Sequence, residues 1–187
     1  LIPTSTPGVR QRMIVCCSKK LCQIPHLEKF LEEPVTTNRF FRNPSAYCGW
    51  GAKPSGRNAE IRARRKHVPY RLLEDGFLRS MGFGDEYPPL SLVVDDKGIY
   101  YDATRPSQLE QWLQNDFEWT PHLKANTAKA RQEIVSHRLS KYNLHSSISC
   151  ELENSLHEQK RVLVIDQTRG DLSIIVGNAS ESTFPDM

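Results

Sequence analysis

The sequence predicts an α/β fold of the Rossmann-like, three-layer type, in which helices cover a mostly parallel sheet. Short apolar runs bounded by glycine, proline or charge alternate along the chain with segments of helical character, and this alternation is typical of parallel sheets. Hydrophobic residues make up 38% and charged residues 25% of the 187 residues, which is the composition of a globular protein. We therefore expect residues 1–187 to form a single domain.

The first elements follow from apolar runs and their boundaries. The run 13–17 predicts a short buried strand, and residues 24–33 predict a helix, with Pro25 tolerated in its first turn. Residues 46–50 predict a second strand, because an apolar run there ends among glycines.

A helix, a strand and a hairpin are expected after residue 51. Ser55 is expected to cap a basic helix that runs to about His67. Residues 70–73 predict a third strand that ends at Glu74. The runs 90–94 and 99–101 flank the turn-forming letters DDKG and predict a β-hairpin.

The last part of the chain is more helical. Ser107 and Glu110 have the spacing of a capping box and predict a helix start. A polar helix is expected from Thr120 and Pro121 to about Asn143. After a polar connector, residues 162–166 predict one more buried strand.

Bulk properties exclude several classes of protein. The net charge of +3 is too small to argue for nucleic-acid binding, and no apolar run approaches the ~20 residues of a membrane span. The five cysteines suggest no disulfide framework, so we expect reduced thiols. Cys16, Cys17 and Cys22 lack the paired spacing of zinc sites, and the histidines form no convincing ligand set.

Long motifs resemble a known family. They are GWGAKPSGRNAEIRAR, RLLEDGFLRSMGFG, PPLSLVVDDKGIYYDATRPSQLE and RVLVIDQTRGDLSI. They resemble the bacterial capsule-polysaccharide biosynthesis and export family of the KpsC/LipA type. Its members are similar to retaining β-Kdo glycosyltransferases, which transfer Kdo from CMP-Kdo to a phosphatidylglycerol-linked acceptor.

The resemblance implies a GT-B transferase of two Rossmann-like halves, of which residues 1–187 would be the acceptor-side half. Leu1 is not an initiator methionine, and we expect a piece of a longer protein whose CMP-binding domain lies beyond Met187. The resemblance also implies a location at the cytoplasmic face of the inner membrane, contact with capsule export machinery, and no cofactor or metal. We expect the fragment alone to be inactive.

Asp171 is the candidate nucleophile. It closes a Q-x-x-x-D pattern that begins at Gln167. A retaining transfer needs a carboxylate against the anomeric carbon, as nucleophile or as partner of an oxocarbenium-like state, and the resemblance gives this role to Asp171. The alternative is that Asp171 caps the next helix or turn.

Glu74 and Asp75 are the candidates for the base that deprotonates the acceptor hydroxyl. Successive residues of an extended segment point to opposite faces, so we expect one of the two to face the cleft. We assign Glu74 as the base and expect Asp75 to face the structure or Arg79. The alternative is an acidic turn before Gly76.

Several other residues are candidates for substrate binding. Arginine binds phosphate and carboxylate with a planar fork, and Arg169 is the best placed of the cations; the alternative is a set of surface ion pairs. The loop around Trp50 joins a strand to a helix start, where backbone N–H groups can meet an anion, although it lacks the order of a Walker loop. An ordinary turn is equally compatible. The binding candidates are Asp75, Arg79, Arg105, Gln167, Arg169, Lys53 and Ser55.

Two charged stretches have simple structural explanations. Asp95 and Asp96 are interpreted as turn residues of the hairpin rather than metal ligands. The basic helix, with Arg57, Arg62 and Arg64 among its cations, is a solvated face or a surface for an anionic membrane.

Two classes of function remain open. The first is an enzyme, the Kdo transferase. The second is a non-catalytic polysaccharide export or assembly protein that uses the same fold to hold glycolipid. Catalytic Asp and Glu side chains facing one cleft would favour the first class.

Overall fold

The computed structural model describes residues 12–84, 86–115, 118–144, 149–150, 162, 164–165, 167–180 and 182. The chain divides into two compact units. Unit 1 contains the residues up to Glu74 together with Val94–Asp96, and unit 2 contains Asp75–Val93 and the residues from Lys97 onward. The expectation of a single domain over 1–187 stays a prediction.

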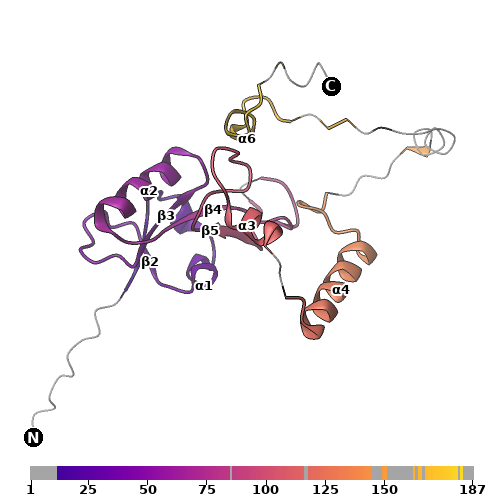
Figure 1. Cartoon of the computed structure of the whole chain (residues 1–187), viewed down its shortest axis with the longest axis horizontal. Helices are drawn as coiled ribbons and strands as arrows, with labels where there is room; N and C mark the ends of the chain where they lie inside the picture. The colour runs from indigo at the N-terminus through magenta and orange to yellow at the C-terminus, as the bar shows by residue number, and fades with distance from the viewer. Residues whose placement is uncertain are drawn as a thin grey trace, which may run out of the picture. The chain divides into compact units, whose positions relative to one another are not determined.

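A five-stranded sheet runs in the order β2-β1-β3-β4-β5 (Figure 1). Strand β1 pairs in parallel with β2 and with β3, and β3 pairs in parallel with β4. This confirms the predicted α/β fold with a mostly parallel sheet. The strands are β1 (Ile14–Cys16), β2 (Val35–Thr36), β3 (Ala46–Trp50), β4 (Tyr70–Asp75) and β5 (Leu92–Asp95).

Helix α2 (Pro54–Lys66) packs closely on β3. Its buried alanines, Ala59 and Ala63, cluster with Val15 and Tyr47 of the sheet. A Cβ added at Gly49 or Gly56 would overlap backbone atoms of the strand-to-helix junction. The small residues therefore allow the first turn of α2 to lie against the end of β3.

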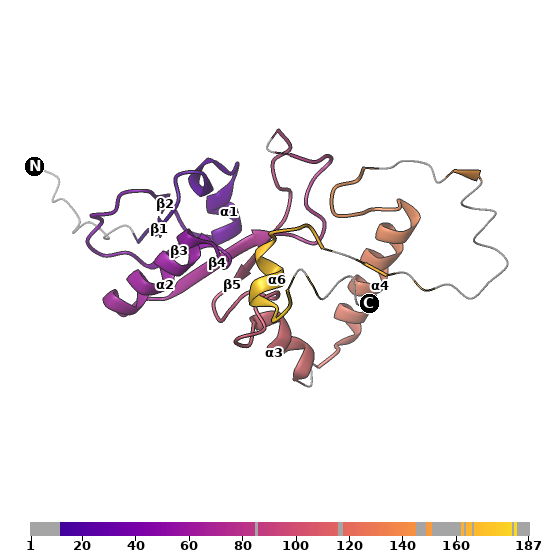
Figure 2. The same ribbon diagram turned by 90° about the horizontal axis from the view of Figure 1, so that it is seen from above.

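Helix α1 (Leu27–Leu31) covers the opposite face of the sheet (Figure 2). Tyr70 of β4 packs with the α2 cluster, whereas the next residue, Arg71, forms an ion pair with Glu33 just after α1, at 3.6 Å. Because successive strand residues point to opposite faces, the two contacts lie on opposite sides of the sheet. The sheet of unit 1 is thus covered on both faces, as the three-layer fold class requires.

The helix expected at 24–33 is shorter than predicted at both ends, since α1 covers only Leu27–Leu31. A 3-10 turn, η1 (Leu21–Gln23), comes first, and α1 starts at Leu27. Ile24 is extended, with φ −63° and ψ 121°, as a residue before proline prefers. His26 is left-handed, with φ 60°, so helical geometry begins only after it.

The expected hairpin is also wrong. Strand β5 continues to Asp95, which is 2% exposed, so Asp95 is a buried strand end and not a turn residue. Residues 99–101 form no strand. Ile99 is fully buried and its carbonyl accepts the Asp102 N–H at 2.9 Å, which makes a turn where the second strand was expected.

The two helices predicted for unit 2 begin where they were expected. Ser107 and Glu110 form the predicted capping box of α3 (Gln108–Gln114). Helix α4 (Pro121–Ser136) begins at Thr120 as predicted but ends before the expected Asn143. Arg138 is left-handed, and the next N–H donates to the Ile134 carbonyl, a Schellman ending that satisfies the last carbonyls of the helix.

The strand expected at 162–166 is absent from its described residues. Val162, Val164 and Ile165 lie outside any strand and are 89%, 55% and 72% exposed; Leu163 and Asp166 lie outside the described residues, as does most of the 146–159 connector. Without burial or a neighbouring strand, the described residues of this run have nothing to hold them extended in a sheet. The later run forms helix α6 (Leu172–Val176). No described helix is long and apolar enough to cross a membrane.

Candidate functional site

The carboxyl ends of β3 and β4 meet at one edge of the sheet in unit 1. Trp50 is in register with Leu73, and the Gly51 N–H donates to the Leu73 carbonyl at 2.8 Å. Glu74 follows directly and is half-buried. It lies inside β4 rather than beyond its end, which extends the predicted strand by two residues.

Strand geometry assigns Glu74 to the α2 face of the sheet. Leu72 is in register with Gly49, whose missing Cβ faces the start of α2. Glu74 lies two residues further along and so points to the same side as Leu72, while Asp75 points to the other. The expectation that only one of these two carboxylates faces the cleft stays a prediction.

The loop between β3 and α2 is held by its own side chains. Ser55 does not cap α2, because the N-cap is Lys53 and Pro54 occupies the first turn. The Ser55 hydroxyl instead accepts the Trp50 N–H at 3.1 Å. The Lys53 ammonium lies 5.8 Å from the centre of the Trp50 ring, a favourable cation–π distance, so Lys53 and Trp50 are next to each other at the sheet edge.

In unit 2, Arg79 forms the centre of a polar network. Its Nε donates to Asp75 Oδ1 at 2.9 Å, and the two side chains are only 12% and 20% exposed. Its Nη1 donates to the Ser80 hydroxyl at 2.9 Å and to the Tyr87 carbonyl at 3.0 Å. The guanidinium thus connects the end of β4 to both sides of the glycine-rich loop that follows, which contains Gly82 and Gly84.

The segment after α4 is bound to the same loop. The Lys141 carbonyl accepts the N–H groups of Arg79 and Ser80 at 2.7 and 3.2 Å. The Asn143 amide donates back to the Ser80 carbonyl at 2.8 Å, and Tyr142 lies 6.0 Å from the Arg79 guanidinium. This contact could not be predicted from the sequence, because residues 63 positions apart carry no local signal of their pairing.

Asp171 is the N-cap of α6. Its Oδ1 accepts the Ser173 N–H at 2.9 Å, and the Gln167 amide donates to the Ser173 hydroxyl at 2.9 Å. Gln167 and Asp171 therefore converge on one residue, and Arg169 is exposed in the turn between them. The helix-cap alternative for Asp171 is seen in the structure; it uses one carboxylate oxygen.

The remaining predicted residues have structural partners. Arg105 Nε lies 3.6 Å from Asp102 Oδ2, so this arginine stabilises the turn after Ile99. Asp95 is buried and Asp96 is exposed. Within the described parts of the chain, no group of three or more His, Cys, Asp or Glu side chains could hold a metal ion.

The cysteines are free thiols, as predicted. Cys16 and Cys48 are a register pair on β1 and β3, with their sulfurs 3.1 Å apart. The hydrogen bond with Cys48 and then burial raise the pKa of Cys16, and burial raises the pKa of Cys22 to about 12. These thiols stay protonated near neutral pH, which makes them poor nucleophiles.

A parallel sheet covered by helices on both faces, with polar residues at its carboxyl edge, defines the class of protein as a Rossmann-like α/β protein. Family comparison is more specific. The chain belongs to the capsule polysaccharide biosynthesis protein family, whose model matches residues 45–161, more than half of the chain. The predicted family resemblance is thereby confirmed.

The names of the related proteins refer to capsule polysaccharide and to lipopolysaccharide. The capsule polysaccharide modification protein LipA of Neisseria meningitidis serogroup A / serotype 4A is 41% identical over 169 residues, which are 89% of this chain and 24% of LipA. The lipopolysaccharide-processing protein LpsZ of Rhizobium meliloti is 37% identical over 153 residues, covering 77% of this chain and 33% of LpsZ.

A solved structure matches nearly the whole fold. It is Thermosulfurimonas dismutans KpsC, a beta Kdo 2,4 transferase, with 43% sequence identity and a TM-score of 0.83. The match covers 96% of this chain and 56% of that structure. The chain therefore spans about a quarter of LipA and about half of the solved KpsC.

Proposed function

We propose that this protein acts in capsular polysaccharide biosynthesis as part of a retaining β-Kdo glycosyltransferase with GT-B architecture. The observation that carries the proposal is the match of nearly the entire chain to the solved β-Kdo transferase at more than 40% identity. In this proposal the donor is CMP-Kdo and the acceptor is a phosphatidylglycerol-linked glycolipid. The CMP-binding half belongs to a second domain outside residues 1–187.

The proposed nucleophile is Asp171. Its carboxylate attacks the anomeric carbon of Kdo while the bond from that carbon to the CMP phosphate oxygen breaks, and CMP leaves with the electron pair. The acceptor oxygen then displaces the Asp171 carboxylate from the same carbon, so two inversions give retention. A non-covalent role, in which Asp171 stabilises an oxocarbenium-like state, would use the same placement.

The proposed base is Glu74, which takes the proton of the acceptor hydroxyl as that oxygen attacks. Glu74 is half-buried at the carboxyl edge of the sheet, where ligands of open α/β sheets bind. Lys53, next to Trp50 at the same edge, supplies a positive charge for an anionic part of the substrate.

The other binding candidates divide into two kinds. Arg169 is exposed beside Asp171 and is proposed to bind the phosphate or carboxylate of the donor. Gln167 supports it through Ser173. Arg79, Asp75, Arg105 and Ser55 bind protein groups, so we propose that they position the loops that carry the site.

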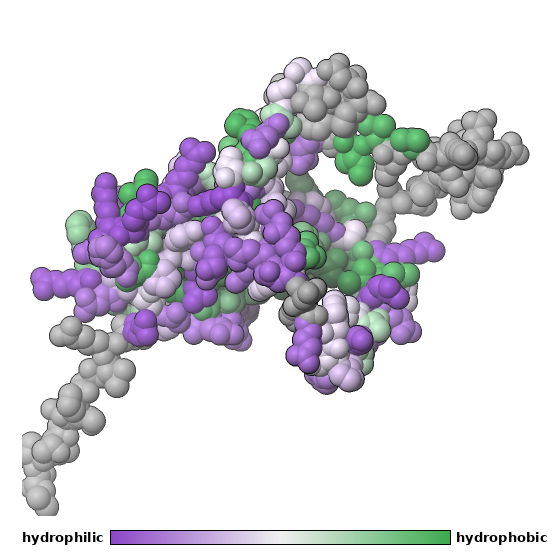
Figure 3. Space-filling view, in the orientation of Figure 1, coloured by the Kyte–Doolittle hydropathy of each residue, from purple (hydrophilic) through white to green (hydrophobic). Residues whose placement is uncertain are grey.

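We also propose a peripheral location at the inner membrane. Arg57, Arg64, Arg65 and Lys66 of α2 are exposed, and hydrophilic side chains gather over this helix in Figure 3. Such a face attracts anionic lipid headgroups, which would bring the chain to a lipid-linked acceptor and to the export machinery.

The second candidate is a non-catalytic assembly protein that holds glycolipid. The helix cap at Asp171 favours this second candidate, because capping α6 explains the presence of this carboxylate without a catalytic role. The Asp75–Arg79 pair is explained by structure in the same way.

Two measurements test the proposal. The full-length protein that contains this chain should convert CMP-Kdo and a phosphatidylglycerol-linked acceptor to a product heavier by one Kdo residue, detected by mass spectrometry. Residues 1–187 alone should show no binding of CMP in calorimetric titration. Absence of product would support the assembly protein, and micromolar binding of CMP to the short chain would show that the nucleotide site is misplaced.

A further inference from the structure

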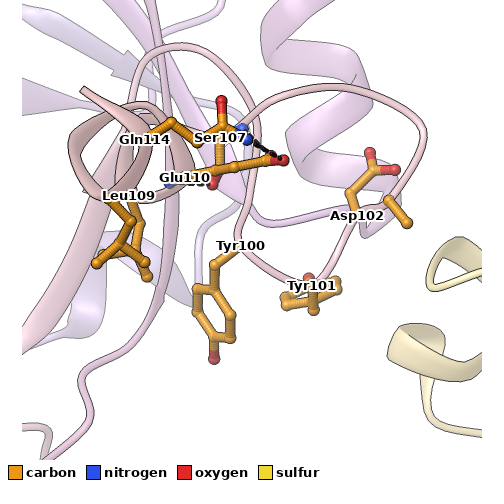
Figure 4. Close-up of a pocket in the computed structure, with 9 residues that line it drawn as sticks. Tyr100, Tyr101, Asp102, Ser107, Leu109, Glu110 and Gln114 are labelled. Atoms are coloured by element: carbon orange, nitrogen blue, oxygen red, sulfur yellow. Dashed lines mark hydrogen bonds between the residues drawn. The ribbon is translucent and has the colours of Figure 1, made fainter.

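Unit 2 contains a groove that includes none of the residues assigned to Kdo transfer. It has a volume of ≈ 490 Å³ and lies between the turn after Ile99 and helix α3 (Figure 4). This volume is within the range of about 300–1,000 Å³ that is typical of sites for small organic ligands. The groove is therefore large enough to be considered as a binding site in its own right.

Tyrosines form one wall of the groove. Tyr100 and Tyr101 contact each other edge to face, with ring centres 5.4 Å apart and planes at 90°. Tyr100 also contacts Phe77, at 5.3 Å, and the turn that carries both tyrosines is anchored by the fully buried Ile99. The rings are thus held in place before any ligand arrives, and such preorganisation lowers the cost of binding.

Polar side chains of α3 form the other wall. Glu110 Oε2 accepts the Ser107 N–H at 3.3 Å, and Glu110 Oε1 accepts the Gln114 amide at 3.3 Å. Figure 4 shows these groups on the helix across from the two tyrosines. A hydrogen-bonding carboxylate and amide therefore lie opposite an aromatic wall.

The charge of the lining is negative. It contains the carboxylates of Asp102 and Glu110 and, among its residues, no lysine or arginine. Arg105 offsets part of the charge of Asp102 from outside the lining, but the lining residues themselves offer no cation to a bound anion. A phosphate or sugar acid would meet like charge here, which disfavours binding.

We propose that this groove binds a neutral, pyranose-containing saccharide. The apolar C–H face of a pyranose packs against aromatic rings, and its hydroxyl groups both donate to carboxylates and exchange hydrogen bonds with an amide. Because the lining residues include no cation, Kdo and CMP-Kdo are disfavoured as ligands of this groove. The inference does not rest on the proposed transferase activity, because it concerns different residues and a different class of sugar.

The test uses matched sugars and the 187-residue chain. Saturation-transfer NMR is recorded with the methyl glycosides of glucose, galactose and mannose, and with methyl glucuronide, which differs from the glucoside by one carboxylate. We expect at least one neutral glycoside to receive saturation and to bind more tightly than the glucuronide. If none binds, or if the glucuronide binds as well as the glucoside, the proposal is wrong.

Variants place the binding in the groove. Tyr101→Ala and Gln114→Ala should each raise the Kd about fivefold to tenfold, whereas Gln111→Ala, on the same helix but outside the lining, should leave it unchanged. Gln114 is exposed, so its variant reports on binding even if Tyr101→Ala unfolds. An unchanged Kd in Gln114→Ala and in a folded Tyr101→Ala would overturn the assignment.

Discussion

Replacing Arg79 tests whether this arginine holds the glycine-rich loop in place or binds the substrate directly. Its guanidinium makes hydrogen bonds to Asp75, Ser80 and Tyr87 at 2.9, 2.9 and 3.0 Å. Arg79→Ala removes all three and leaves the Asp75 carboxylate, only 20% exposed, without this cation. Breaking a fully buried pair costs 3–5 kcal/mol, so for this nearly buried pair we expect a loss of about 3 kcal/mol.

Lysine is the informative second substitution. Arg79→Lys keeps the positive charge but has no planar fork, so it cannot reach Asp75 and the Ser80 and Tyr87 oxygens together. We expect it to lose about 1–2 kcal/mol, since one charged hydrogen bond survives. Arg64→Lys, on the exposed face of α2, is the matched control and should change stability by less than about 0.5 kcal/mol.

The assay is urea unfolding followed by circular dichroism, with the midpoint and slope fitted for each variant. The organising role is supported if the urea midpoint falls from the wild type to Arg79→Lys and again to Arg79→Ala while the slope stays constant. If Arg79→Ala unfolds within about 0.5 kcal/mol of the wild type, the network contributes little, and a direct role of Arg79 in substrate binding becomes the better explanation.

Two further predictions follow from the packing of unit 1. Gly56→Ala should lower stability by about 1–3 kcal/mol, because its Cβ would overlap the Gly51 carbonyl and the close approach of α2 to β3 would be lost; thermal unfolding measures this, and an unchanged Tm would contradict it. The raised pKa values of Cys16 and Cys22 favour the protonated thiols in the folded state. The stability that these protonated thiols contribute to the folded state is complete below the pKa of a thiol in the unfolded chain, about 8.5. It is lost as the pH rises above that value. Unfolding measured from pH 7 to 10 should show stability falling above pH 8.5, and less steeply in Cys22→Ala; equal slopes would contradict the account.

The elements that could be predicted are those determined by residues close together in the sequence. The capping box at Ser107 and Glu110 places both hydrogen-bonding partners within one turn, so the start of α3 could be predicted. Strand β3 was likewise predicted from its apolar run, and α2 ends near His67 as predicted. The parallel order of the sheet followed from their alternation with helices.

Features that depend on tertiary contacts or on burial could not be predicted from the sequence. The hydrogen bond from the Asn143 side-chain amide to the Ser80 carbonyl joins distant segments, and its acceptor is a backbone group that every residue type carries. Ser55 fits the pattern of a helix cap, yet its hydroxyl accepts the Trp50 N–H, because the helix starts at Pro54 and its N-cap is Lys53, two residues before Ser55. Asp95 fits a turn by composition, but burial at the end of β5 is a tertiary effect.

The central claim is that Asp171 acts as a catalyst and not only as a helix cap, and Asp171→Asn in the full-length protein separates the two roles. Asparagine caps helices about as well as aspartate, so the fold and the Tm should be preserved while Kdo transfer is abolished. In the same assay, Glu74→Gln should lower the rate by about 10²–10⁴-fold, and Asp96→Asn, an exposed control, should be mild. Near-normal transfer by Asp171→Asn would contradict the account and leave Asp171 as a cap alone.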